Sequence, residues 1–386
     1  MIYLDANATT PLLPEVLDAM LPWLREGFAN PSGSYAAAKQ ARRAIDQARA
    51  QVAELLGAEA DEIVFTGGGT ESVNTALCSL HGLAGAGAAV TSAIEHGAVL
   101  RCLEHLPRET RLSPVNAGGR LDLTAFASAL DGAAFVSLMA ANNETGVIQP
   151  LREAVALAHD HGLPVHSDAI QAAGKIPLTV RETGVELLSL SAHKFHGPKG
   201  VGALYVRRGL QFKPLLRGGD QEAGRRGGTE NTAAIVGMGA AALCAQQHLH
   251  TPQAGLPNAP RDAFEARVLA TTSGVTVNGD TSHRLPNTSH LSFDQCDAAG
   301  LLILLDEAGV ACSAGSACLT GKHRPSHVQL AMDIPEARAK TSLRISFSRL
   351  NTLQEALAAA DVVRQVVAKL RRVQGPGVGP VVVYPP

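Results

Sequence analysis

Short runs of apolar residues recur along this chain, and longer stretches between them carry apolar residues with the period of a helix. The short runs are typical of buried strands, and the longer stretches are typical of helices that cover a sheet. The predicted strands are 62–66, 88–92, 134–139, 164–167, 187–191 and 201–206. The clearest predicted helices are 14–23, 35–56, one that begins near residue 71, and 152–161. This alternation predicts an α/β fold in which helices cover both faces of a mainly parallel sheet.

The pattern changes between residues 247 and 261, where His, Pro, Gly and Asn interrupt both periodicities. A smaller α+β region follows, with predicted strands at 276–278, 290–293 and 343–346 and predicted helices at 298–308 and 353–369. We therefore expect a large domain over 15–255 and a small domain formed by 1–14 together with 256–374. The tail, 375–386, is rich in Pro and Gly, and we expect it to be flexible.

Composition excludes several classes of protein. The chain has 386 residues, which favours two domains over one. Its 33 Lys and Arg residues against 35 Asp and Glu give no reason to expect nucleic acid or an anionic membrane surface as a partner. The N-terminus lacks the pattern of a signal peptide, and apolar runs such as 301–305 are far too short to span a membrane. The six cysteines are scattered without the density of a disulfide scaffold, so we expect free thiols and a cytoplasmic location.

An acid, a glutamine and a lysine stand at the ends of two predicted strands near the middle of the chain. Asp168 and Gln171 follow strand 164–167, and Lys194 follows strand 187–191. A lysine amine can form a Schiff base with the aldehyde of pyridoxal 5′-phosphate (PLP). An acid beside the pyridine nitrogen keeps that nitrogen protonated, so that the ring accepts electrons. The set therefore predicts a PLP enzyme.

Gly67-Gly68-Gly69-Thr70 offers an anion site between a predicted strand and a predicted helix. Free main-chain N–H groups, the positive end of the helix dipole and the Thr70 hydroxyl all favour an anion there. The segment has neither the lysine of a P-loop nor the spacing G-x-G-x-x-G. A tight turn that caps the helix is the alternative, and the lysine and acid downstream favour a phosphate site.

Two further strand ends carry polar residues that can contact a cofactor ring. His96 can lie flat on a pyridine ring and move protons, because imidazole titrates near neutral pH. Asn143 can donate a hydrogen bond to the phenolate oxygen. The alternative for His96 is an ordinary surface histidine, one of the 14 in the chain. The alternative for Asn143 is an ordinary turn rich in Asn and Gly.

A cysteine follows three small residues in Gly315-Ser316-Ala317-Cys318. Small neighbours leave a thiol accessible, and accessibility together with thiolate character makes a cysteine reactive. The alternative is a buried cysteine that packs as a small hydrophobic residue, and the polar, glycine-containing surroundings favour the reactive one. The spacings of Cys312, Cys318, His323 and His327 do not match a zinc finger, so no metal site is predicted.

Two segments that contain arginine complete the candidate chemistry. Arg344 lies inside an apolar predicted strand, where its guanidinium needs an anionic partner. The carboxylate of an amino-acid substrate would fit it, and a structural ion pair is the alternative. Residues 217–229, the Gly/Arg loop, resemble an RNA-binding RGG tract in composition. Because this loop is short and contains acidic residues, we expect it to reach a phosphate and not to bind RNA.

Together these motifs resemble those of the cysteine desulfurases of the NifS/IscS kind, in the class V aminotransferase group of PLP enzymes. The resemblance runs from Tyr3 to about Leu350. It rests on the opening Y-L-D-x-x-A-T-T-P and on T-x-x-x-T-E-S, E-H-x-A-V-L, N-N-E-x-G, D-A-x-Q, S-x-H-K, G-S-A-C and S-x-R. It implies the PLP-dependent transferase fold type I and a homodimer whose active sites lie at the subunit interface.

The resemblance also implies a role for each candidate residue. Lys194 would carry PLP, Asp168 would pair with the pyridine nitrogen and His96 would stack on the ring. Cys318 would accept sulfur and Arg344 would bind the substrate carboxylate. Asn143 and Gln171 would contact the phenolate oxygen, and Asn143 would also contact the substrate. The phosphate would be held by Gly69, Thr70, Ser191 and His193, together with Thr229 of the other subunit.

The implied activity converts L-cysteine to L-alanine and leaves the sulfur as a persulfide on Cys318. An acceptor protein would then take the sulfur for iron–sulfur cluster assembly or a thiolation pathway. A selenocysteine lyase or another class V PLP aminotransferase is the main alternative, and a non-catalytic sulfur carrier or scaffold is a second. Cys318 argues against an aminotransferase, and the intact Lys194, Asp168 and His96 argue against a scaffold. Ala223 stands where the family usually has an arginine, so the phosphate loop can bind differently.

Overall fold

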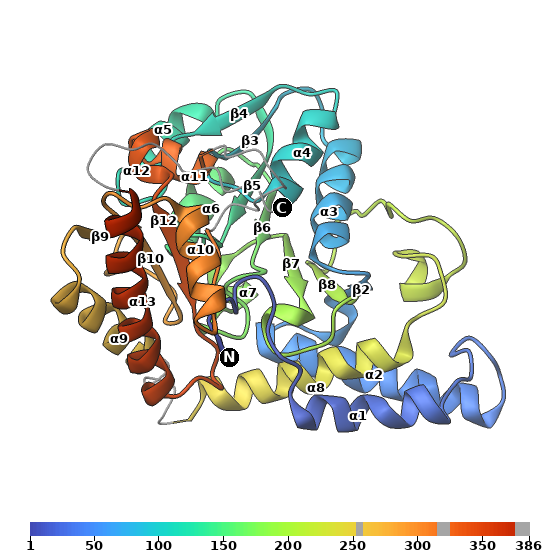
Figure 1. The fold of residues 1–386 in the computed structure, drawn as a ribbon. Helices are drawn as coiled ribbons and strands as arrows, with labels where there is room; N and C mark the ends of the chain where they lie inside the picture. Colours follow the sequence, from blue (N-terminus) through green and yellow to red (C-terminus); the bar gives the residue numbers. More distant parts are fainter. Residues whose placement is uncertain (252–257, 315–324, 375–386) are drawn as a thin grey trace, which may run out of the picture.

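A sheet of seven strands lies at the centre of the part of the chain that the computed structural model describes, residues 1–251, 258–314 and 325–374 (Figure 1). Across the sheet the strands follow the order β2-β8-β7-β6-β5-β3-β4. Their bounds are β2 Ile63–Thr66, β3 Ala88–Ser92, β4 Thr110–Ser113, β5 Ala133–Met139, β6 Val165–Asp168, β7 Leu187–Ser191 and β8 Gly202–Val206.

Neighbouring strands of this sheet are parallel except around β8, which runs antiparallel to both β2 and β7. The prediction of a mainly parallel sheet is therefore confirmed. Because the carboxyl ends of parallel strands meet at one edge, the residues that follow β3, β6 and β7 come together there. Asp168 ends β6 and pairs in register with Ser189 of β7, close to the turn that carries Lys194.

Helices cover both faces of the sheet (Figure 1). Side chains alternate between the faces along β2, where Ile63 and Phe65 join one core and Val64 joins the other. The first core is covered by α1 Pro14–Arg25, α2 Ala36–Leu56, α5 Leu123–Ala129, α6 Leu151–Asp160, α7 Val180–Thr183 and α8 Thr232–Leu249, and the second by α3 Gly69–Leu83 and α4 Gly97–His105. None of the helices in the described ranges is long and apolar enough to cross a membrane.

A separate core joins the start of the chain to residues near its end. Leu4 is buried in the same cluster as Phe264, Leu343 and Phe347. The strands β12-β10-β9 form an antiparallel sheet here, and β1 pairs in parallel with β11. The bounds are β1 Ile2–Tyr3, β9 Val275–Val277, β10 Thr288–Phe293, β11 Val310–Ala311, β12 Ser342–Ser346, α9 Asn258–Thr271, α10 Ala298–Glu307, α11 His327–Ala331, α12 Glu336–Ala339 and α13 Leu353–Gln374. The proposed domain boundaries themselves stay a prediction.

The largest difference from the sequence-based expectation is α8. This helix packs against both α1 and α2, and buried residues lie on most of its sides. It therefore lacks the polar face that marks a helix in sequence. It also runs to Leu249, and α9 begins at Asn258, so helices extend into both ends of the segment in which the sequence predicts a break. Residues 252–257 lie outside the described part of the chain.

Candidate functional site

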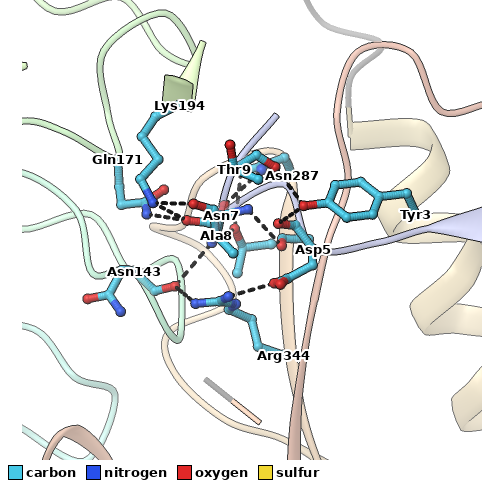
Figure 2. Close-up of polar contacts among 12 residues, drawn as sticks. Tyr3, Asp5, Asn7, Ala8, Thr9, Asn143, Gln171, Lys194, Asn287 and Arg344 are labelled. Carbon is cyan, nitrogen blue, oxygen red and sulfur yellow. Dashed lines mark hydrogen bonds and ion pairs between the residues drawn. The ribbon is translucent and has the colours of Figure 1, made fainter. Parts of the chain in front are cut away.

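Lys194 lies in a short 3-10 turn, Ala192–Lys194, that directly follows β7. Its amine donates hydrogen bonds to main-chain carbonyl oxygens of the N-terminal segment, at 2.6 Å to Asn7 and at 2.8 Å to Ala8 (Figure 2). Burial and the nearby charge of Arg344 lower the pKa of the amine to about 8. A substantial part of the Lys194 population is then neutral near physiological pH, which is the form that attacks an aldehyde.

Asp168 is a buried carboxylate, with 5% of its surface exposed. Its Oδ1 atom accepts a hydrogen bond from the main-chain N–H of Ile170 at 2.9 Å. Within the described ranges no cation pairs with it directly, and burial raises the pKa of the carboxyl group against the opposing influence of His96 and Lys194. Because a buried charge without a counter-ion is costly, the position suits a ligand that brings a protonated nitrogen.

His96 is the N-cap residue of α4, a few residues after β3. Its Nδ1 atom accepts a hydrogen bond from the main-chain N–H of Ala98 at 3.1 Å, so the neutral ring carries its proton on Nε2. Burial lowers the pKa of the imidazole, and Lys194 lowers it further, whereas Asp168 raises it. The neutral ring therefore has a hydrogen-bond donor at Nε2 beside the lysine and the acid.

A pocket of about 390 Å³ lies at the start of α3. The main-chain N–H groups of Gly69 and Thr70, in the first turn of this helix, have no acceptor in the described chain. Such groups and the helix dipole favour a bound anion. The wall of the pocket includes Thr9, Gly69, Thr70, Ser191, His193 and Lys199. The structure thus brings together the residues expected at a phosphate, and it adds the positive charge of Lys199, which the sequence analysis does not single out.

The residues of this site fit PLP. A Cβ atom at Gly69 would lie 2.3 Å from Cδ1 of Ile170, so the start of α3 packs closely against the segment that carries Asp168 and Gln171. The unpaired N–H groups of α3, the amine of Lys194 and the unpaired carboxylate of Asp168 match the phosphate, the aldehyde and the pyridine nitrogen of the cofactor.

Gln171 and Asn143 both contact Asn7, from different elements (Figure 2). The Nε2 atom of Gln171 donates to the main-chain oxygen of Asn7 at 2.9 Å, and the same oxygen accepts the Lys194 amine. Asn143 contributes its main-chain oxygen, which accepts from Nδ2 of Asn7 at 3.2 Å. The side-chain amide of Asn143 points away from these contacts in Figure 2, and within the described residues it has no hydrogen-bond partner.

Arg344 lies in β12 and is paired with Asp5, with 2.6 Å between Nη2 and Oδ1 (Figure 2). Its Nη1 atom donates to the main-chain oxygen of Asn143 at 3.1 Å, and its buried Nε atom has no partner in the described chain. The ion pair that the sequence analysis gives as the alternative for Arg344 is thus present. The unpaired Nε atom leaves part of the guanidinium fork without an acceptor.

Ion pairs join the Gly/Arg loop to α2 and α3. Arg49 donates to both carboxylate oxygens of Glu222, at 2.5 and 2.7 Å. Arg226 pairs with Glu71 at 2.9 Å, beside the start of α3. Thr229, near the end of the loop, is exposed and is not part of the pocket wall in its own subunit.

Cys318 lies outside the residues that the structure describes, as does the tail 375–386. Its role therefore stays a prediction from the sequence. Cys312 is described, and burial raises the pKa of its thiol to about 12. Such a thiol is protonated at neutral pH and is a poor nucleophile.

Asn7 and Lys175 are residues of the site that sequence reasoning misses. Asn7 is 1% exposed, and its side-chain oxygen accepts hydrogen bonds from Lys175 at 3.0 Å and from Asn287 at 3.1 Å. It falls at an unspecified position of the opening motif Y-L-D-x-x-A-T-T-P, and no local pattern reveals its contacts with residues far along the chain. The signal for Lys175 is its spacing of four residues from Gln171, which brings the two side chains together if the segment turns like a helix.

Comparison with known families gives one match that covers most of the chain. The family model described as "Aminotransferase class-V" matches residues 2–358. This range includes the central sheet, every candidate site residue named above and the smaller core except for its residues in the later part of α13.

Individual relatives match over nearly the whole chain. A protein named cysteine desulfurase from Gluconacetobacter diazotrophicus is 47% identical over 377 residues, which are 96% of this chain and 94% of the relative. Cysteine desulfurase NifS from Azotobacter vinelandii is 46% identical over 378 residues, again 96% of this chain and 94% of the relative. The solved structure of a NifS-like protein superposes with a TM-score of 0.89 at 33% identity, covering 96% of this chain and all of that one.

Proposed function

Because the chain belongs to the class-V aminotransferase family, as a PLP-dependent cysteine desulfurase of the NifS kind, we propose that Lys194, Asp168 and Cys318 carry the conversion of L-cysteine to L-alanine. The observation that supports this assignment most strongly is the edge of the central sheet where β6 ends in Asp168, a buried acid without a counter-ion in the described chain, and the turn after β7 carries Lys194, whose amine has a lowered pKa.

The cofactor contacts are assigned to residues around the Lys194 amine. Lys194 would bind the aldehyde carbon, Asp168 would hold the proton on the pyridine nitrogen, and His96 would pack against the ring. When bound, PLP supplies a protonated ring that withdraws electrons from the substrate. The remaining contacts would come from Asn143 and Gln171 at the phenolate oxygen and from Gly69, Thr70, Ser191 and His193 at the phosphate.

Lys194 would also move protons during the reaction. Burial and Arg344 lower the pKa of its amine to about 8, so the free amine can accept a proton from Cα of L-cysteine and return one to the product. His96 would assist, because its neutral ring holds a proton on Nε2.

Cys318 would take up the sulfur. Its thiolate attacks the sulfur atom of the substrate, and the Cβ–S bond of cysteine breaks as the S–S bond of a persulfide forms. The electron pair of the broken bond stays with the carbon skeleton, which takes up protons and leaves as alanine. Arg344 would hold the substrate carboxylate during this step. The raised pKa of Cys312 supports Cys318 as the nucleophile of the two.

The active protein would be a homodimer in which each Gly/Arg loop reaches the partner's site. Thr229 is exposed in its own subunit, and the loop that carries it is anchored by two ion pairs. Leu215 and Leu216, directly before the loop, are each 40% exposed, which suits a surface covered by a second subunit.

The persulfide sulfur would pass to an acceptor protein in the cytoplasm, for iron–sulfur cluster assembly or a thiolation pathway. A persulfide is a suitable form for transfer, because another thiolate can attack its outer sulfur. The five cysteines in the described ranges are free thiols, which supports a reducing compartment.

The test is to supply PLP-loaded protein with L-cysteine and a thiol reductant, and to measure alanine and sulfide together. We expect the two products in equal amounts from the wild type and neither from Lys194→Ala. Lys340→Ala is the matched control, because this exposed lysine pairs only with Glu336 in the described chain and should keep full activity. Wild-type protein that forms no alanine, or alanine without sulfide, would contradict the proposal.

A further inference from the structure

Lys175 lies beside the active site but has no part in the mechanism above. It is in the turn that follows β6, and its amine donates to Oε1 of Gln171 at 2.7 Å and to Oδ1 of Asn7 at 3.0 Å. No carboxylate in the described ranges pairs with it. Burial lowers the pKa of this amine well below its usual value, and the charges of Lys194 and Arg344 lower it further. A lysine held by two amide oxygens instead of a carboxylate is unusual, because such a position costs desolvation without a counter-ion.

The contact decides which way the amide of Gln171 faces. The oxygen and nitrogen ends of an amide are alike in shape, so their hydrogen-bond partners determine the orientation. The amine of Lys175 donates to two oxygen atoms, Oε1 of Gln171 and Oδ1 of Asn7, and therefore favours Oε1 on its side. On the other side, the main-chain oxygen of Asn7 accepts from Nε2 at 2.9 Å. Both contacts require the same orientation, and the nitrogen end faces the carbonyl oxygen that also accepts the Lys194 amine.

Asn7 does not depend on Lys175 in the same way. Its Oδ1 atom also accepts from Nδ2 of Asn287 at 3.1 Å. Its Nδ2 atom donates to the main-chain oxygen of Asn143 at 3.2 Å and to the hydroxyl of Thr288 at 2.9 Å. Removal of the Lys175 amine therefore leaves Asn7 anchored, whereas Oε1 of Gln171 loses its only partner in the described chain.

We propose that Lys175 is a positioning residue that holds Gln171 so that an amide N–H, and not an amide oxygen, faces the phenolate oxygen of the cofactor beside Lys194. This inference rests on the proposed function, because it assigns a task to Gln171 within the PLP enzyme. A donor at the phenolate oxygen withdraws electron density from it, so the proton on the Lys194 nitrogen is held less strongly. Loss or reversal of that donor raises the pKa of the Lys194 nitrogen in the holoenzyme.

The experiment is a pH titration of the visible absorption band of the holoenzyme. Lys175→Met and Gln171→Met should each raise the midpoint by about one pH unit, the effect of one hydrogen bond. The double variant should show no larger shift than either single one, because Lys175 acts through Gln171. Lys340→Met is the matched control, since this lysine is exposed, and should leave the midpoint unchanged. Lys175→Ala, which leaves room for water, should give the same rise and serves if Lys175→Met does not fold.

An unchanged midpoint in the Lys175 variants would overturn the inference. Shifts that add in the double variant would overturn it too, because they would show that Lys175 acts by its own charge. Borohydride reduction and mass spectrometry of the wild type separate these results from a failure of the proposed function. A pyridoxyl group on Lys194 supports the function on which the titration depends, and one on another lysine contradicts both.

Discussion

The amine nitrogen of Lys194 lies 2.6 Å from the main-chain carbonyl oxygen of Asn7, a residue 187 positions earlier in the chain. The first residues of the protein thus form part of the wall around its central lysine. A carbonyl oxygen fixes the amine in place without the full negative charge of a carboxylate. Burial can therefore lower the pKa of Lys194 to about 8, although Asp168 and Asp5 oppose it at longer range.

Covalent uptake of PLP by the cofactor-free protein should have a midpoint near pH 8. The neutral amine is the reactive form, and its fraction rises as the pH rises through the pKa of Lys194, which burial and Arg344 lower to about 8. The growth of visible absorbance after mixing measures the rate. A rate that keeps rising up to about pH 10.4, the pKa of an ordinary lysine, would contradict this environment for Lys194.

Gly69→Ala should weaken PLP binding by about tenfold or more, since a Cβ atom would lie 2.3 Å from Cδ1 of Ile170 and push the turn that follows Asp168. Ile170→Val lacks Cδ1, so the double variant should recover much of the affinity. Gly85→Ala is the control, because a methyl group at that position would meet nothing within 4 Å. Equilibrium titration with PLP measures each affinity, and an unaffected Gly69→Ala would show that the start of α3 is not a close-fitting wall of the site.

Arg344→Ala should lower kcat/KM for L-cysteine and leave PLP bound. If the guanidinium holds the substrate carboxylate in this buried position, the loss corresponds to roughly 2–5 kcal/mol. Steady-state kinetics together with the visible spectrum separate substrate use from cofactor binding.

The control for Arg344 is its partner, Asp5, which pairs with it at 2.6 Å. Asp5→Asn removes the ion pair but keeps the guanidinium, so it should change kcat/KM far less than Arg344→Ala does. The combination of Asp5→Asn with Arg344→Ala should remain as impaired as Arg344→Ala alone. Recovery in the combined variant would show instead that Arg344 serves only to neutralise Asp5.

Subunit mixing should reveal the shared site. If Thr229 serves the partner's pocket, a dimer of one Lys194→Ala subunit and one Thr229→Ala subunit contains one intact site. Random exchange of subunits between equal amounts of the two variants should then raise the activity above that of the unmixed variants. The expected gain is about one quarter of the wild-type activity. No gain on mixing, or a fully active monomer by light scattering, would argue against a site built from two subunits.

The parts of the fold that the sequence predicts are those with strong local signals. The strands that end at Met139, Asp168 and Ser191 are short buried runs between turns, and the structure confirms them nearly residue for residue. Because these strands and the one that ends at Ser92 are parallel, their carboxyl ends lie at one edge of the sheet. The sequence alone is therefore enough to group Asp168, Lys194 and His96 at that edge. α8 has no such signal, because a helix buried on most sides loses its polar face.

The contacts of the N-terminal segment could not be predicted in this way. Asn7 reaches Lys194, and Asp5 reaches Arg344, only because β1 is placed beside β11. No local pattern encodes a contact between residues so far apart in sequence. The backbone conformation of Ala223 could not be predicted either. This exposed residue has a φ of 56°, which the local sequence does not indicate.

The measurement that tests the central claim most directly is the location of the transferred sulfur. The PLP-loaded protein is given one equivalent of L-cysteine, alkylated and digested, and its peptides are examined by mass spectrometry. We predict one extra sulfur atom on the peptide that contains Cys318, and none on that peptide in Cys318→Ser, which should keep the PLP spectrum but form no alanine. Cys312→Ser, at the cysteine whose pKa burial raises to about 12, should leave the result unchanged. Extra sulfur on Cys312, or normal turnover of L-cysteine by Cys318→Ser, would contradict the account.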